Sequence, residues 1–270
     1  MNNKLHFLTF ANTDFMNTDR IINQAKSFDM FDKIISLTEH DIPEYIEKHK
    51  QFINDNKYGY GLWIWKPKII LDTLNTLSEN DIMLYCDAGL YLNNNGTERF
   101  KYYLDKLNDD NINIITFSTN DNYKSKYYVK NDAIMHYYPE FNSELNNDNA
   151  CYAGIMIIKK NEQTLKLIED WLILCENYHF LDRSNSYIYT DFPYYAGNDC
   201  DNGLFNLCLS KYKKIVFFIY PDEVNLYSSN GNQLAHTDID YNTWDWNILD
   251  KSPFQCRRIT PKLHNYNSLL

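Results

Sequence analysis

Hydrophobic and polar positions along the chain follow two periods, one typical of strands and one typical of helices. Short apolar runs predict buried strands, and apolar residues three or four positions apart predict amphipathic helices. The runs interpreted as strands are Leu5–Phe10, Phe31–Leu37, Asp81–Cys86, Ile112–Phe117, Cys151–Ile158 and Lys214–Tyr220. The segments with a helical period are Asp19–Phe28, Asp41–Phe52, Lys68–Leu77, Thr97–Leu107, Glu162–Cys175 and Asp199–Lys211.

This alternation predicts an α/β domain with a mostly parallel sheet flanked by helices. No internal repeat or glycine- and proline-rich hinge divides the chain, so we expect residues 1–270 to form one domain. Residues 120–149 are polar and aromatic without a clear period and are interpreted as functional loops, and the tail beyond residue 222 is expected to be irregular. Ligands of such sheets bind at the carboxyl ends of strands. That rule points to Phe10-Ala11-Asn12, to Asp87-Ala88-Gly89 and to the loop after Phe117.

The composition of the chain mainly excludes classes of function. The formal net charge is −10, and no basic stripe of the kind that binds nucleic acid is present. No apolar run approaches the roughly 18 residues of a membrane span, and the N-terminus lacks the apolar core of a signal peptide. We therefore expect a cytoplasmic protein, in the host cytoplasm or the virion if the source is viral. The six cysteines are dispersed without a CxxC pair and are expected to be reduced thiols.

An acid directly follows the apolar run Asp81–Cys86. Asp87 is followed by Ala88 and Gly89, which are small enough for a ligand to approach the backbone closely. A carboxylate at the carboxyl end of a strand can bind Mn²⁺ or Mg²⁺, and the ion can bridge the two phosphates of a nucleotide sugar. Taken alone, an acid at an ordinary turn after a strand is the simpler interpretation.

The run Gly59–Pro67 places Trp63, Trp65 and Lys66 just before a predicted helix. The first turn of a helix offers free backbone N–H groups and the positive end of the dipole, which attract phosphate. Core packing explains each tryptophan by itself, and a solvated side chain explains Lys66. The three residues together favour a ligand site.

These two runs resemble a family of bacterial and viral glycosyltransferase-like proteins. The matching patterns are Gly-Tyr-x-x-Trp-Ile-Trp-Lys-Pro and, further along, Asp-Ile-x-Leu-Tyr-x-Asp-Ala-Gly. That family is similar to DXD-type enzymes of the GT-A fold, in which a Rossmann-like nucleotide-binding sheet is joined to an irregular acceptor-binding half. The resemblance implies that about residues 1–118 bind a nucleotide sugar and about 119–270 face the acceptor. Weaker matches downstream are Val129–Asp132, Asn149–Gly154, Trp171 and Asn198–Asn202.

Within the resemblance, Asp87 matches the first acid of the DXD motif and Gly89 takes the place of the second. Asp87 is then expected to contact the ribose of the donor or an Mn²⁺ or Mg²⁺ ion. A late histidine would complete the metal site, either His264 or, as second choice, His236, although a surface histidine is the simpler interpretation of each. With glycine at the second position, Asp87 holds the ion with less help or the site works without one.

The remaining roles follow from the same resemblance and from general acid–base chemistry. Asp201 is the expected base or positioning group for the acceptor hydroxyl, and Asp199 is the alternative, with a helix cap as its other explanation. The family's His and Gln at this element are replaced here by Asn198 and Asn202. Residues expected to bind the donor are Phe10, Ala11, Trp65, Lys66, Asp87, Ala88, Gly89, Lys130 and Asp132.

We therefore predict a glycosyltransferase that moves a hexose from a nucleoside diphosphate sugar, expected to be UDP-linked, to a hydroxyl on a glycan, protein or small acceptor. The alternative is a non-catalytic binder of nucleotide or glycan, supported by Gly89 and by 23 Tyr, 15 Phe and 5 Trp that could stack on sugars. A glycoside hydrolase with paired acids ranks below both. The sequence lacks the motifs of serine hydrolases, P-loop proteins, zinc proteases and dinucleotide-binding enzymes.

Overall fold

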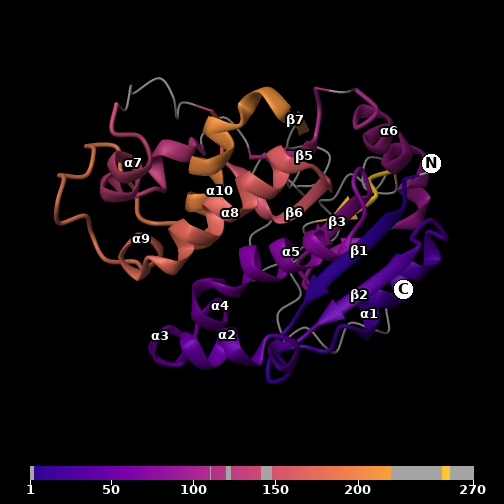
Figure 1. Cartoon of the computed structure of the whole chain (residues 1–270), viewed down its shortest axis with the longest axis horizontal. Coiled ribbons are helices and arrows are strands. Elements are labelled where there is room, and N and C mark those ends of the chain that lie inside the picture. The colour runs from indigo at the N-terminus through magenta and orange to yellow at the C-terminus, as the bar shows by residue number, and fades with distance from the viewer. Residues whose placement is uncertain (1–2, 110, 120–122, 141–147, 220–250, 256–270) are drawn as a thin grey trace, which may run out of the picture.

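The centre of the molecule is a six-stranded sheet in the order β2-β1-β3-β6-β5-β7 (Figure 1). The computed structural model describes residues 3–109, 111–119, 123–140, 148–219 and 251–255. All neighbouring strands are parallel except around β6, which runs antiparallel between β3 and β5. The strands are β1 (Leu5–Phe10), β2 (Lys33–Leu37), β3 (Ile82–Cys86), β5 (Ile114–Ser118), β6 (Cys151–Lys159) and β7 (Val216–Ile219). The predicted α/β class with a mostly parallel sheet is confirmed.

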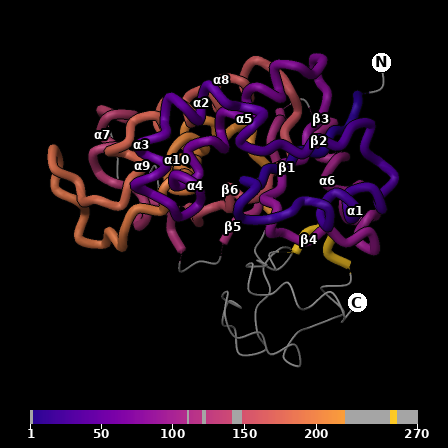
Figure 2. The backbone as a smooth tube through the Cα atoms, turned by 90° about the horizontal axis from the view of Figure 1, so that it is seen from below, coloured from indigo at the N-terminus to yellow at the C-terminus, as the bar shows by residue number. Residues whose placement is uncertain are grey.

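Helices cover both faces of this sheet. In Figure 2, α2, α5 and α8 lie on one side of the strands, and α1 and the short strand β4 (Tyr91–Leu92) lie on the other. A second small sheet joins β4 to β8 (Phe254–Gln255). The helices are α1 (Asp19–Ser27), α2 (Pro43–Lys48), α3 (Lys50–Asp55), α4 (Gly59–Leu62), α5 (Trp65–Thr76), α6 (Thr97–Lys106), α7 (Asn131–Tyr137), α8 (Glu162–Glu176), α9 (Tyr178–Leu181) and α10 (Cys200–Lys211).

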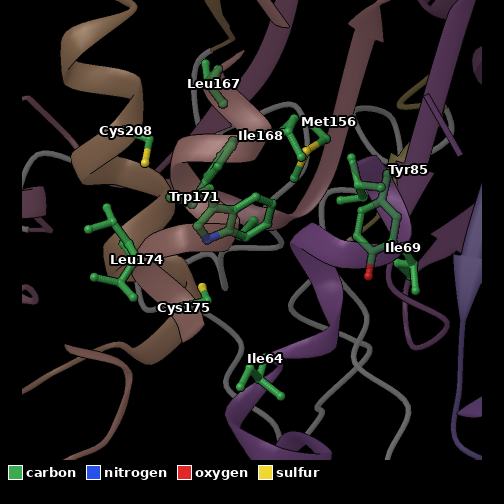
Figure 3. Packing of buried hydrophobic residues seen from close by; sticks show 14 of the residues in the cluster. Ile64, Ile69, Tyr85, Met156, Leu167, Ile168, Trp171, Leu174, Cys175 and Cys208 are labelled. Carbon is green, nitrogen blue, oxygen red and sulfur yellow. The ribbon is translucent and has the colours of Figure 1, made fainter. Parts of the chain in front are cut away.

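Alternate residues of each strand enter two separate cores, because successive strand side chains point to opposite faces. In β3, Met83 and Tyr85 join the core formed with α5, α8 and α10, whereas Leu84 and Cys86 join the core formed with α1 and α6. Figure 3 shows Tyr85 in the first of these cores, with Trp171 of α8 near its centre. The same period places the next odd-numbered side chain, Asp87, on the α5 and α10 face.

The short elements α4, α9, β4 and β8 were not predicted, and two further differences concern helices. The expected helix over Asp41–Phe52 is divided at His49 into α2 and α3. The segment interpreted as loops contains the short helix α7, whose first turn is held from far along the chain. Its Asn131 N–H donates to Asp191 Oδ1 at 3.0 Å. This contact lies 60 residues away in sequence, so the local pattern carried no sign of it.

Two further expectations concern the chain as a whole. Five of the six cysteines lie in the described ranges, and all five are buried free thiols, as predicted: Cys86, Cys151, Cys175, Cys200 and Cys208. Cys256 lies outside them. Within the described ranges, every helix is too short or too polar to cross a membrane.

Candidate functional site

The candidate site centres on three charged residues at the carboxyl end of β3, here called the Lys66 cluster: Lys66, Asp87 and Asp201. Lys66, in the first turn of α5, places its Nζ 3.2 Å from Asp87 Oδ1, 3.5 Å from Asp87 Oδ2 and 3.0 Å from Asp201 Oδ2. The side chains of Lys66 and Asp201 are 3% and 4% exposed, whereas that of Asp87 is 24% exposed. Three residues predicted in separate elements therefore meet, and Asp87 is the one that faces outward. The interpretation of Lys66 as a solvated side chain is wrong.

The Asp87 carboxylate is fixed on several sides. Tyr85, two residues earlier on the same face of the sheet, donates its hydroxyl to Asp87 Oδ1 at 2.6 Å. The Asp87 N–H donates to the carbonyl of Gly154 in β6 at 2.8 Å. A Cβ atom added at Gly154 would lie 2.7 Å from Asp87 Oδ2, which is too close for any side chain. Position 154 therefore has to be glycine for the carboxylate to keep this place.

The turn after Asp87 is tied to helix α1 by Arg20. Its guanidinium donates to the carbonyl oxygens of Ala88 at 2.5 Å and of Leu90 at 2.8 Å, and it lies 4.3 Å from the centre of the Tyr91 ring. Burial lowers the pKa of Arg20. Arg20 thus fixes the backbone of the turn that presents Asp87, a role that its position in an amphipathic helix did not reveal.

Small and aromatic residues from the predicted donor site lie at the ends of β1 and β3. Ala11 and Ala88 are buried together in one small cluster. Phe10 stacks on Trp65 with ring centroids 3.9 Å apart, and both rings are at most 5% exposed. Trp65 also donates its indole N–H to the Gly59 carbonyl at 3.1 Å. The structure therefore places these two aromatic rings in the core beneath the Lys66 cluster.

A left-handed turn leads into α5. Five consecutive residues, Gly59, Tyr60, Gly61, Leu62 and Trp63, have φ angles between 53° and 85°. For a residue with a side chain this conformation costs about 1–2 kcal/mol, so the turn is strained at its three non-glycine positions. The Trp63 carbonyl then accepts the Lys66 N–H at 2.9 Å. The strained turn therefore sets where the first turn of α5, and with it Lys66, begins.

Burial and neighbouring charges shift the pKa values of Lys66 and Asp201 in opposite directions. Burial raises the pKa of Asp201 to about 7, against the opposing charge of Lys66. Burial also disfavours the charge of Lys66, but the carboxylates of Asp201 and Asp87 raise its pKa overall. The contact between Lys66 and Asp201 Oδ2 is an ion pair without hydrogen-bond geometry. A carboxyl group that titrates near neutral pH is suited to accept and return a proton.

Asp201 and its neighbours are held by the start of α10. The Asp201 carbonyl accepts the indole N–H of Trp171 at 2.9 Å. Asp199 occupies the N-cap position of α10, but its carboxylate accepts a hydrogen bond from the Asn202 side chain at 2.7 Å and makes no capping bond. The Asn202 side-chain oxygen in turn accepts the N–H of Ala153 at 2.6 Å. The first turn of α10 is thereby joined to the same part of β6 that packs against Asp87.

The remaining predicted donor residues, Lys130 and Asp132, lie in a separate network. Lys130 Nζ donates to the His179 carbonyl, to Asp182 Oδ1 and, at 2.9 Å, to Ser184 Oγ. Asp132 accepts the His179 ring N–H at 2.7 Å and three consecutive backbone N–H groups of residues 187–189. Both side chains thus hold the segment 179–189 in place. Contact of either with a donor stays a prediction.

The late histidine that was predicted to complete a metal site with Asp87 is not among the described residues. His264 and His236 both lie beyond the described residues. Among the residues that are described, no three His, Cys, Asp or Glu side chains gather in a way that could hold an ion. A metal at Asp87 therefore stays a prediction.

Sequence reasoning missed Tyr85, Arg20 and the part that Gly154 plays beside Asp87. A signal existed for Tyr85, because a residue two positions before Asp87 in a strand must share its face. For Gly154 the signal was a glycine inside an apolar strand, which indicates close approach of another group. Arg20 carried no local signal, since its partners are backbone carbonyls 68 and 70 residues away.

Neither a protein-family model nor the sequence of a curated protein matches the chain. Among solved structures, a glycosyltransferase involved in glycosylation of the major capsid of PBCV-1 aligns over 93% of this chain and 92% of its own, with 11% identity and a TM-score of 0.47. Mouse xyloside xylosyltransferase 1 aligns over 96% and 99%, with 9% identity and a TM-score of 0.45. The 4-diphosphocytidyl-2C-methyl-D-erythritol synthase of Anaerococcus prevotii aligns over 93% and 97%, with 11% identity and a TM-score of 0.39. These likenesses concern the course of the backbone, and the choice of function rests on the site.

Proposed function

We propose that the chain is a glycosyltransferase that moves a hexose from a nucleoside diphosphate sugar, a UDP sugar in the first instance, to a hydroxyl of a glycan, protein or small acceptor. The observation that carries this proposal is the Lys66 cluster. It joins the two sequence runs that resemble the glycosyltransferase family, and it lies at the carboxyl ends of β1 and β3, where ligands of parallel sheets bind.

The donor roles follow from exposure and charge. Asp87 is the outward-facing carboxylate of the cluster, so its oxygens are the ones placed to accept donor hydroxyls. Ala11 and Ala88 are small side chains at the ends of β1 and β3, and their backbone is the one that the proposed nucleotide approaches. Lys66 supplies a fixed positive charge beside Asp87, and such preorganised charge stabilises the departing nucleoside diphosphate.

The acceptor base is assigned to Asp201, with Asp199 as the alternative. A pKa near 7 suits a base at neutral pH. Its side chain is 4% exposed, so the acceptor oxygen has to come within about 3 Å of a nearly covered group. Asp199 is more exposed but is engaged by Asn202. The variants Asp201→Asn and Asp199→Asn separate the two, because loss of the base lowers kcat with little change in donor KM.

Release of nucleoside diphosphate from a panel of nucleotide sugars tests the proposal. The full chain should release the diphosphate slowly in the absence of acceptor, and Asp87→Asn should reduce this rate by about 10²-fold or more. Asp72→Asn is the matched control, because Asp72 lies on α5 and pairs with Lys68 at 2.7 Å, outside the site. Release that is equal in Asp87→Asn and in the unmodified chain would contradict the proposed role of Asp87.

A non-catalytic binder of nucleotide or glycan is the second candidate, favoured by Gly89 at the position of the second acid. The same panel decides between the two functions. Binding of a nucleotide sugar with no release of diphosphate, with or without an acceptor, would support the binder and contradict the enzyme.

A further inference from the structure

The charge of Asp87 is already compensated by groups of the chain itself. The ammonium of Lys66 lies in front of both carboxylate oxygens, 3.2 Å from Oδ1 and 3.5 Å from Oδ2. A divalent ion held by both oxygens would need this same position. Asp87 Oδ1 also accepts the Tyr85 hydroxyl at 2.6 Å, which leaves that oxygen with two partners.

On the Oδ2 side, the described residues that pack against the carboxylate carry no second ligand. Gly154 packs against Oδ2, and Gly89 has no side chain to replace the missing acid. Divalent ions such as Mg²⁺ and Mn²⁺ are held by several oxygen ligands, usually including carboxylates, and an ammonium at this distance repels them. The described residues around Asp87 therefore do not fit a metal ion.

Lys66 is also held by Asp201, the more buried of the two acids. Asp201 Oδ2 lies 3.0 Å from its Nζ on the inner side, so the ammonium is shared between an outer and an inner acid. The ring centres of Trp63 and Tyr85 lie 5.6 and 5.9 Å from the same Nζ, within the range of cation–π attraction. These contacts fix one positive charge at the point of the site where a cation would be needed.

Resting on the proposed function, we infer that the donor site works without a divalent cation. Lys66 takes the place of the ion in front of Asp87, and the exposed part of the Asp87 carboxylate accepts donor hydroxyls. A nucleoside diphosphate therefore binds equally well in the presence and absence of metal.

Calorimetric titration of the full chain with UDP tests this inference, first in EDTA and then in Mn²⁺. We expect the two dissociation constants to agree within about 2-fold, a difference of little energetic weight. Binding that appears only with Mn²⁺, or tightens about 10-fold with it, overturns the inference and leaves the proposed function intact. Absence of UDP binding in both conditions overturns the proposed donor class and this inference with it.

Mn²⁺ alone provides a second readout that needs no nucleotide. The electron paramagnetic resonance signal of free Mn²⁺ should be unchanged by the full chain, which includes His264 and His236. Loss of the signal that is reversed in Asp87→Asn overturns the inference.

The variant Lys66→Gln tests the lysine directly, because it removes the charge and keeps most of the length. We expect its UDP affinity in EDTA to fall about 10-fold or more, and Mn²⁺ to restore part of it at the vacated position. Lys68→Gln, two residues along the same helix, is the control that should bind UDP like the unmodified chain. Unchanged affinity of a folded Lys66→Gln protein in EDTA overturns the inference. If Lys66→Gln does not fold, the two measurements on the unmodified chain decide.

Discussion

Two buried lysines, Lys66 and Lys130, have different kinds of partners. Lys130 is fully buried, and its ammonium donates to three acceptors, of which Asp182 is a carboxylate that remains 32% exposed. Lys66 is shared between two carboxylates, of which Asp201 is nearly covered and lacks a hydrogen bond on Oδ2. The Lys130 ammonium therefore has an acceptor for each of its three N–H groups. The Lys66 ammonium belongs to a group of one basic and two acidic side chains.

This difference is the one expected between a structural lysine and the functional lysine proposed above. An ammonium with three good acceptors holds a segment of chain, as Lys130 holds residues 179–184. In a largely buried group of charges, desolvation can cost more than the contacts return, and such groups are frequent at functional sites. The comparison supports the proposed donor role of the Lys66 cluster, and it is consistent with structural support by Lys130.

The largest effect is expected for Lys66→Met. Removing the ammonium leaves Asp201 buried beside an apolar side chain, which should lower the free energy of unfolding by about 3–5 kcal/mol. Release of nucleoside diphosphate should be lost as well. Denaturant unfolding and the release assay measure the two effects. Lys68→Met, in an exposed pair on the same helix, should change stability by no more than about 0.5 kcal/mol.

Lys130→Met is expected to lower the free energy of unfolding by about 2–3 kcal/mol. The loss is smaller because Asp182 is partly exposed and is rehydrated when its hydrogen bond to the ammonium is removed. Denaturant unfolding measures this change, and steady-state kinetics should show an unchanged KM for the donor. A donor KM raised about 10-fold or more at unchanged stability would instead support the sequence prediction that Lys130 contacts the donor.

Gly154→Ala tests how closely Asp87 must be held. The added methyl group would lie 2.7 Å from Asp87 Oδ2, so the carboxylate has to shift from its present position beside Lys66. We expect a loss of stability of about 1 kcal/mol, because Asp87 is partly exposed and free to move outward. The rate of diphosphate release should fall about 10²-fold, as expected for a displaced reacting group. An unchanged rate would show that the position of Asp87 is not critical.

The last effect is spread over several pH units and is a pH dependence of stability that depends on Asp201. Its pKa is about 7 in the folded chain and 3.8 in its ordinary state. Between these values the folded chain holds a proton that the unfolded chain has released. Stability should therefore fall as the pH rises from about 4 to about 7, by at most about 1.4 kcal/mol per pH unit. Unfolding curves of Asp201→Asn should lack this slope, and identical pH profiles for the two proteins would contradict the assignment.

Much of the fold was predictable from sequence because its signals are local. The apolar runs of β1, β3 and β6 and the helical period of α8 needed no distant partner, and each was confirmed. The short helix α7 was missed because hydrogen bonds from residues 186–191 stabilise its first turn. A helix whose start is fixed by tertiary contacts leaves no trace in its own sequence.

The three members of the Lys66 cluster were predictable one by one, and their arrangement was not. Asp87, Lys66 and Asp201 were each chosen as polar residues at the end of a strand or the start of a helix. The position of the Lys66 ammonium between Asp87 and Asp201 depends on the strained turn at residues 59–63. The glycines in that turn suggested positive φ angles, but Tyr60, Leu62 and Trp63 take them against their own preference, and only packing enforces this.

The reversed direction of β6 places its first residue at the edge of the sheet that carries the Lys66 cluster and its last residue at the opposite edge. Because β6 runs against its neighbours, its first residue Cys151 lies beside Ser118 at the site edge, and its last residue Lys159 lies beside Ile82 at the far edge. There the chain turns at Lys160. Its backbone carbonyl accepts the Asn80 N–H at 2.9 Å, and its backbone N–H donates to the Asp81 carbonyl at 2.8 Å. We expect inserted tags, fluorescent reporters or new termini to disturb the Lys66 cluster least at this far edge. Changes in the length of the segment between residues 119 and 150, by contrast, would alter the edge that carries the Lys66 cluster.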